Sequence, residues 1–132
     1  MKKAINWWIG CILTITVVLG AGCDENTVSK PEDIVFPDSS VSFQRHVLPF
    51  FQLTCAYAGC HDDQTQAGGI ALTSYFNLWT KPGLIIPGDP DNSVLVQILE
   101  GRLSHPPSFQ ARVTQNHIRG IRQWIAEGAK NN

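Results

Sequence analysis

Cys55 and Cys60 lie five positions apart, and His61 follows them directly. This Cys-x4-Cys-His arrangement constrains the chain more than any other feature, because two thiols and an imidazole this close together have few uses. The thiols can add to the vinyl groups of a haem while the imidazole binds its iron, they can form a disulfide, or they can contribute to a zinc site. The usual haem-attachment spacing is Cys-x2-Cys-His, and this motif contains two more residues.

The first 22 residues have the pattern of a secretory signal peptide. Lys2 and Lys3 precede an apolar run over residues 5–19, and small residues lead from that run to Cys23. The run is shorter than the roughly 20 apolar residues that span a bilayer, so a transmembrane helix is the weaker interpretation. We therefore expect the protein to be exported.

Residues 19–23 resemble the lipobox of bacterial lipoproteins, in which cleavage occurs before a cysteine that becomes lipid-modified. The family prefers leucine three residues before the cysteine, and here Gly20 occupies that position. The resemblance implies that Cys23 carries the lipid and anchors the protein to a membrane, on the periplasmic side of the cell envelope. An ordinary cleavage site with Cys23 as a free thiol is the alternative.

The expected export helps to decide among haem attachment, a disulfide and a zinc site for Cys55, Cys60 and His61. Residues 24–132 hold no cysteine besides Cys55 and Cys60, and in an oxidising compartment a lone close pair forms a disulfide unless something else captures it. A zinc site needs about four ligands and would have to recruit further histidines. A redox-active thiol pair has tighter spacing on a βαβ background, which is missing here. We favour covalent haem, with the disulfide as the main rival.

Residues 23–39 are polar, contain two prolines and show no periodicity, which predicts a flexible tether before a globular domain over residues 40–132. Within that domain, apolar residues recur at helical spacing in three places, and no segment reads as a convincing strand. The first helix has Ser40 or Ser42 as its cap, and Pro49 should kink or shorten it. The three predicted stripes are Phe43, Val47, Phe50 and Phe51; Val94, Leu95, Ile98 and Leu99; and Ile118, Ile121, Trp124 and Ile125.

The later helices also have recognisable boundaries. Gly120 lies beside the stripe of the last helix, where a missing side chain would let another helix approach closely. A short helical piece is expected over residues 74–79. The predicted fold class is therefore all-α, with long loops between few helices. The expected caps and stops are Asp91, Asn92 or Ser93 with Gly101 for the second stripe, and Thr114 with Gly128 for the last.

The charge balance argues against nucleic acid as a partner. Ten basic residues face eleven acidic ones, for a formal net charge of -1, and no basic stripe could neutralise phosphates. Lys2 and Lys3 leave with the signal, so the formal charge of the remaining chain is near -3. A domain of about 90 residues with so many turns has a thin core, which a large apolar cofactor would complete.

Several other segments accompany the Cys-His motif in a fixed order. A short helix with a proline precedes it, a Gly-Gly-Ile-Ala-Leu segment follows over residues 68–72, a Pro-Gly-Asp-Pro turn begins at Pro87, and the last helix ends in Trp-Ile-Ala-Glu-Gly-Ala. This order resembles the small, class-I-like cytochrome c domains in exported proteins of planctomycetes, Bacteroidetes-type bacteria and their relatives. The resemblance implies a helical domain wrapped around one covalent haem c, attached through Cys55 and Cys60, with His61 as the proximal axial ligand.

The family places its second axial ligand in a Met-Pro-Pro loop. The only methionine here is Met1, and the corresponding loop has His105 followed by two prolines. The resemblance therefore implies His105 as the distal ligand, and the prolines stiffen the loop that carries it. The alternative is a loop histidine that binds nothing and leaves the iron open. His46, off the stripe of its helix, and His117, in the first turn of the last helix, are weaker candidates.

These expectations describe an electron carrier rather than an enzyme. A mono-haem cytochrome c with two histidine ligands would exchange electrons with redox partner proteins in the cell envelope, held to a membrane by its lipid. A His/His pair gives a lower reduction potential than a His/Met pair. Two other functions stay open: a haem domain with an open iron that senses or reacts with a small ligand or peroxide, and a disulfide-stapled interaction module without haem.

Overall fold

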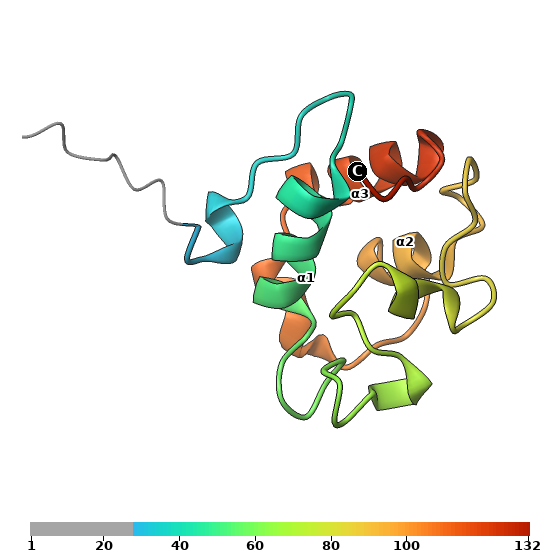
Figure 1. The fold of residues 1–132 in the computed structure, drawn as a ribbon. Coiled ribbons are helices and arrows are strands. Elements are labelled where there is room, and N and C mark those ends of the chain that lie inside the picture. The colour runs from blue at the N-terminus through green and yellow to red at the C-terminus, as the bar shows by residue number, and fades with distance from the viewer. Residues whose placement is uncertain (1–27) are drawn as a thin grey trace, which may run out of the picture.

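The computed structural model describes residues 28–132, apart from the side chains of Pro107 and Ser108. This part of the chain is helical and contains no strand, so the predicted all-α class is confirmed as a small domain of three α-helices with several 3-10 turns (Figure 1). The α-helices are α1 (Leu48–Thr54), α2 (Val94–Leu99) and α3 (Gln115–Ala126). The shorter elements are the 3-10 helices η1 (Pro31–Asp33), η3 (Ala67–Gly69), η4 (Phe76–Trp79) and η5 (Pro107–Arg112), and the π-helical turn η2 (Phe43–Val47).

The first predicted helix forms in two parts, η2 and α1. Ser42 caps it as expected, because its hydroxyl accepts a hydrogen bond from the N–H of Arg45 (3.3 Å). Pro49 lies in the first turn of α1, where its missing N–H costs least. The preceding turn is widened to a π-helix, so the expected irregularity at Pro49 is also present. All four residues of the predicted stripe, Phe43, Val47, Phe50 and Phe51, are buried.

Helix α3 follows the prediction closely. The hydroxyl of Thr114 accepts from the N–H of His117, which caps the helix, and Gly128 follows it at a φ of 96°. Trp124 is fully buried, and its indole N–H donates to the carbonyl of Lys130 (2.9 Å). This bond folds the C-terminal tail back onto the domain. Ile121, Trp124 and Ile125 are buried as expected, Ile118 is only partly buried, and His117 and Gly120 join the buried face.

Helix α2 begins after Ser93, one of the expected cap residues, but the hydroxyl of Ser93 is used differently. It donates to the carbonyl of Asp89 (2.8 Å) and accepts from the N–H of Ile86 (2.9 Å). Ser93 therefore fastens the preceding turn rather than the helix itself. The buried face consists of Leu95, Val96 and Leu99, whereas Val94 and Ile98, which the stripe included, are only partly buried.

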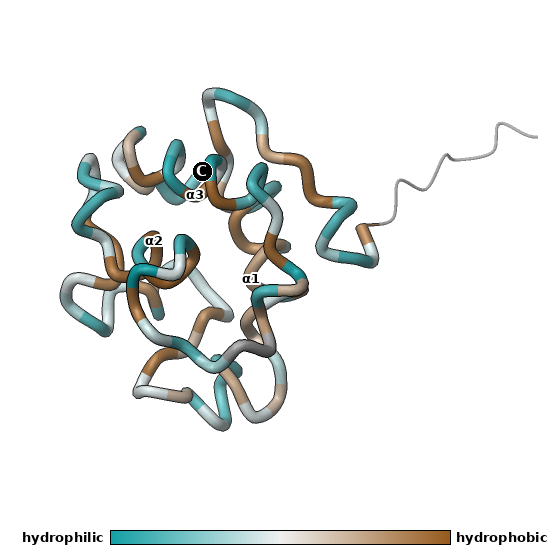
Figure 2. Tube along the Cα trace, turned by 180° about the vertical axis from the view of Figure 1, so that it is seen from behind, coloured by the Kyte–Doolittle hydropathy of each residue, from teal (hydrophilic) through white to brown (hydrophobic). Residues whose placement is uncertain are grey.

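The predicted tether over residues 23–39 ends earlier than expected. Ile34 and Phe36 are buried in the core, and Figure 2 shows this short apolar stretch between two hydrophilic ones. Asn116 of α3 holds it, because its side chain accepts from the N–H of Phe36 (2.8 Å) and donates to its carbonyl (3.1 Å). The folded domain thus starts before Ser40, at about Ile34. The apolar run Ile34-Val35-Phe36 is only three residues long, which is too short to show a period, so the sequence pattern did not reveal it.

Gly120 does allow a close approach, but to Phe36 rather than to another helix. A Cβ atom at Gly120 would lie 2.0 Å from Cγ of Phe36.

The predicted signal peptide over residues 1–22 and the predicted lipid-bearing Cys23 lie outside the described residues. Within the described residues, no helix is long and apolar enough to cross a membrane.

Candidate functional site

The segment from Cys55 to His61 forms a closed loop at the end of α1. The N–H of His61 donates to the carbonyl of Cys55 (3.2 Å), and the N–H of Cys60 donates to the carbonyl of Tyr57 (2.9 Å). Tyr57, Ala58 and Gly59 are exposed. The two additional residues of the motif therefore bulge outward, while Cys60 and His61 return to the point where the loop began.

Both cysteines are free thiols. Cys55 packs partly buried against the core, with its Sγ 3.1 Å from the hydroxyl oxygen of Thr54. Burial raises the pKa of the Cys55 thiol to about 11; the hydroxyl of Thr54 opposes this shift, and the nearby Cys60 adds to it. Cys55 is thus protonated at neutral pH, and thiolate attack, the step by which a disulfide forms, is disfavoured at this sulfur.

His61 is oriented by the segment that follows the motif. Its Nδ1 lies 3.1 Å from the carbonyl oxygen of Ile70, and its own carbonyl accepts from the N–H of Leu72 (2.9 Å). Gly68 and Gly69, at φ angles of 65° and 74°, turn the chain so that residues 70–72 run back along His61. A carbonyl oxygen only accepts, so Nδ1 must carry the proton, and the lone pair is on Nε2. This is the usual arrangement of a metal-binding histidine.

The ring of His105 lies beside that of His61, although the two come from distant loops. Their centroids are 5.8 Å apart, and the ring planes are inclined by 35°. Nδ1 of His105 contacts the carbonyl oxygen of Pro106 (3.1 Å), which again assigns the proton to Nδ1 and the lone pair to Nε2. Phe109 of η5 packs its ring edge-on against His105, with centroids 4.7 Å apart.

The other two histidines have the opposite tautomer. Nδ1 of His46 accepts from the N–H of Ser42 (3.0 Å), and Nδ1 of His117 accepts from the N–H of Thr114 (3.1 Å). In a neutral imidazole the proton must then be on Nε2, and that of His117 points to the carbonyl oxygen of Ile34 (3.1 Å). Neither has an Nε2 lone pair to offer. The hydrogen bonds thus separate the four histidines into one pair able to bind a metal through Nε2 and one pair engaged in structure.

Two imidazoles alone make an incomplete set of ligands for a bare metal ion. Among residues 28–132, no three His, Cys, Asp or Glu side chains gather as a zinc site would need. Haem differs, because its iron already has in-plane nitrogen ligands and takes only axial ones from the protein. The ring centroids of His61 and His105 are 5.8 Å apart, so the two imidazoles lie close enough together to bind a common metal ion. The donor set fits haem better than zinc.

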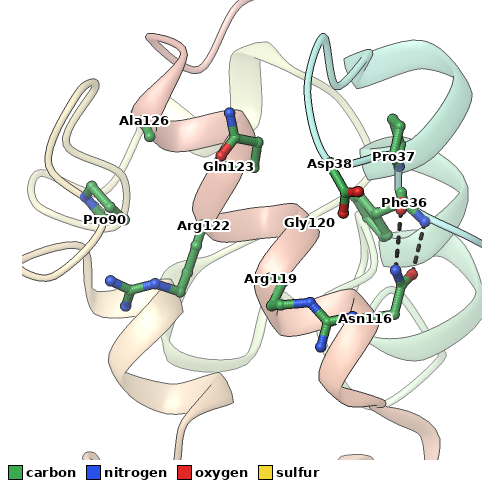
Figure 3. A pocket seen from close by; sticks show the side chains of 10 residues that line it. All are labelled: Phe36, Pro37, Asp38, Pro90, Asn116, Arg119, Gly120, Arg122, Gln123 and Ala126. Carbon is green, nitrogen blue, oxygen red and sulfur yellow. Dashed lines mark hydrogen bonds between the residues drawn. The ribbon is translucent and has the colours of Figure 1, made fainter.

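A surface cavity of about 360 Å³ lies elsewhere, between residues 36–38, Pro90 and α3 (Figure 3). Its lining includes Asn116, which holds the backbone of Phe36, and the guanidinium groups of Arg119 and Arg122. None of the candidate ligands reaches it. The predicted ligands His61 and His105 therefore lie outside this cavity.

Comparison with protein-family models, curated proteins and solved structures finds no match to the chain. The structure brings together the predicted His61 and His105 and leaves the weaker candidates His46 and His117 with structural roles. Sequence reasoning did not identify the carbonyl groups of Ile70 and Pro106, because main-chain acceptors leave no signal in residue type.

Proposed function

We propose that the chain is a mono-haem c-type cytochrome that transfers electrons in the bacterial cell envelope. Cys55 and Cys60 hold the haem covalently, His61 binds the iron from the proximal side, and His105 binds it from the distal side. The observation that carries this proposal is the approach of His61 to His105, at 5.8 Å between ring centroids, with both Nε2 lone pairs free.

The protein residues have distinct roles in this proposal. The hydrogen bond from Nδ1 of His61 to Ile70 fixes the ring orientation and makes Nε2 a better donor. Phe109 supports the ring of His105 from the side. When bound, the haem would supply one-electron chemistry, and the protein's part is ligation, orientation and burial.

Two neutral imidazoles favour a low reduction potential, because a methionine ligand would raise it. Cys55 and Cys60 are unpaired and lie in one closed loop, which leaves both sulfurs available for haem attachment. With Cys23 lipid-modified after signal cleavage, the domain would remain at a membrane on the periplasmic side, where its partners are redox proteins. We expect no catalytic residue in this carrier.

The test is a visible absorption spectrum of the full chain, produced in cells with haem c maturation machinery. A six-coordinate low-spin spectrum that titrates reversibly between two oxidation states supports the carrier. A high-spin spectrum would instead identify an open iron and a domain that senses or reacts with a small ligand or peroxide. Absence of any haem band, with a Cys55–Cys60 disulfide in the same sample, would leave a disulfide-stapled interaction module.

A further inference from the structure

Arg112 and Tyr57 join the two loops that carry the candidate ligands. The guanidinium carbon of Arg112 lies 4.6 Å from the centroid of the Tyr57 ring, over its face. Tyr57 belongs to the Cys55–Cys60 loop, and Arg112 is the last residue of η5, which follows His105. The contact is a cation–π interaction between segments far apart in the sequence.

Each partner is firmly attached to its own loop. The hydroxyl of Tyr57 donates to the carbonyl of Leu53 in α1, and the carbonyl of Tyr57 accepts from the N–H of Cys60. On the other side, Phe109 anchors η5, because it is 7% exposed and packs against the ring of His105. The position of Arg112 therefore constrains the position of His105 through the short helix η5.

The side chain of Arg112 makes no ion pair in the described part of the chain. The ion pairs there are made by Arg102 with Glu100 and by Arg122 with Asp91 and Glu100. The aromatic face of Tyr57 is thus the contact that fixes the direction of Arg112. A planar guanidinium stacks on such a face better than the compact ammonium of a lysine does.

We propose that Tyr57 and Arg112 form a latch that holds the His105 loop over His61, a role that rests on the proposed function. Arg112 is then a positioning residue for the distal ligand. The latch also gives the stretched Cys-x4-Cys spacing a purpose: the outward bulge of the motif displays Tyr57 where Arg112 can cover it. The loop that attaches the haem and the loop that closes it are in direct contact through this pair.

The first experiment uses the haem-free chain and measures amide hydrogen exchange over residues 109–113. A cation–π contact at an exposed site shifts a closing equilibrium by about twofold to fivefold. We expect Arg112→Ala and Tyr57→Ala to accelerate exchange of these amides by that factor, since exchange follows the opening equilibrium of the segment. Tyr57→Phe keeps the ring but loses the bond to Leu53, so its exchange should fall between that of the wild type and that of Tyr57→Ala. Arg112→Lys should also fall between the wild type and Arg112→Ala.

The second experiment measures binding of free imidazole to the haem-loaded protein. Imidazole must displace His105, so weakening the latch should increase its affinity by the same factor of about two to five. Arg119→Ala removes another exposed arginine, on α3, and serves as the matched control.

Exchange rates and imidazole affinities that are equal in Arg112→Ala and Arg119→Ala would overturn the latch. If the protein attaches no haem, the proposed function fails, and the exchange rates of the haem-free chain still decide whether the latch exists.

Discussion

The ring of Phe36 fills the space that a side chain on Gly120 would need. A Cβ at Gly120 would lie 2.0 Å from Cγ and 2.2 Å from Cβ of Phe36. Phe36 is in turn fastened by Asn116, one turn earlier in α3. The segment before the first predicted helix is therefore part of the core, and its position depends on the absence of a side chain at Gly120.

We predict that Gly120→Ala destabilises the domain. Overpacking of this kind lowers the free energy of unfolding by about 1–3 kcal/mol, which exceeds the roughly 0.5–1 kcal/mol that alanine gains over glycine inside a helix. Urea unfolding monitored by circular dichroism measures the change. On a Phe36→Gly background, which removes both the ring and the Cβ that lies 2.2 Å away, the same substitution should be neutral or stabilising. An equal cost in both backgrounds would show that Phe36 is not what excludes the side chain.

We predict a loss of stability as the pH falls below about 6.5, caused by His117. Burial lowers the pKa of His117 below its ordinary value of 6.5, although hydrogen bonds to backbone carbonyls oppose the shift. The unfolded chain therefore takes up a proton near pH 6.5, while the folded protein does so only at lower pH. The contribution of neutral His117 to the free energy of unfolding is complete above about pH 6.5. It is lost as the pH falls towards the pKa of His117 in the folded protein.

His117→Gln isolates this effect, because glutamine can complete the same capping box but does not titrate. Unfolding free energies measured between pH 7 and 5 should decline less in this variant than in the wild type. Burial also lowers the pKa of His46, with a further contribution from Arg45, so His46→Gln should lessen the decline in the same direction. A decline unchanged by either substitution would contradict the assignment to these histidines.

Replacing His105 should change the reduction potential in a defined direction. In the haem-loaded protein, His105→Met should raise the potential on the order of 0.1 V, within the roughly 0.8 V that axial ligands cover. His105→Ala should give a high-spin spectrum. His46→Ala serves as a control, because its Nδ1 accepts from Ser42 and its Nε2 offers no lone pair. A low-spin spectrum with unchanged potential in His105→Ala would exclude His105 as the ligand.

The helices could be read from the sequence because their signals are local. The stripe of Phe43, Val47, Phe50 and Phe51 is buried as a helical period predicts, and Thr114 caps α3 with the bond that its residue type favours. Val96 is buried although the stripe of α2 did not include it. A helix of six residues has too few turns for its pattern to determine which side faces the core.

The candidate site could be predicted only in part. The sequence named His61 and His105, and the structure adds that their rings approach and that both Nε2 atoms are free. The tautomers follow from main-chain carbonyls, whose positions depend on the fold and not on residue type. The Tyr57–Arg112 contact joins two irregular loops, and no periodicity links such segments.

The intact mass of the full chain, purified from cells that mature c-type cytochromes, tests the central claim most directly. We predict a domain heavier by one haem that stays attached under denaturing conditions, and loss of that mass in a Cys55→Ser, Cys60→Ser double variant. His46→Ala should keep the haem. A mass without haem, lower by two hydrogens because Cys55 and Cys60 are joined as a disulfide, would contradict the account.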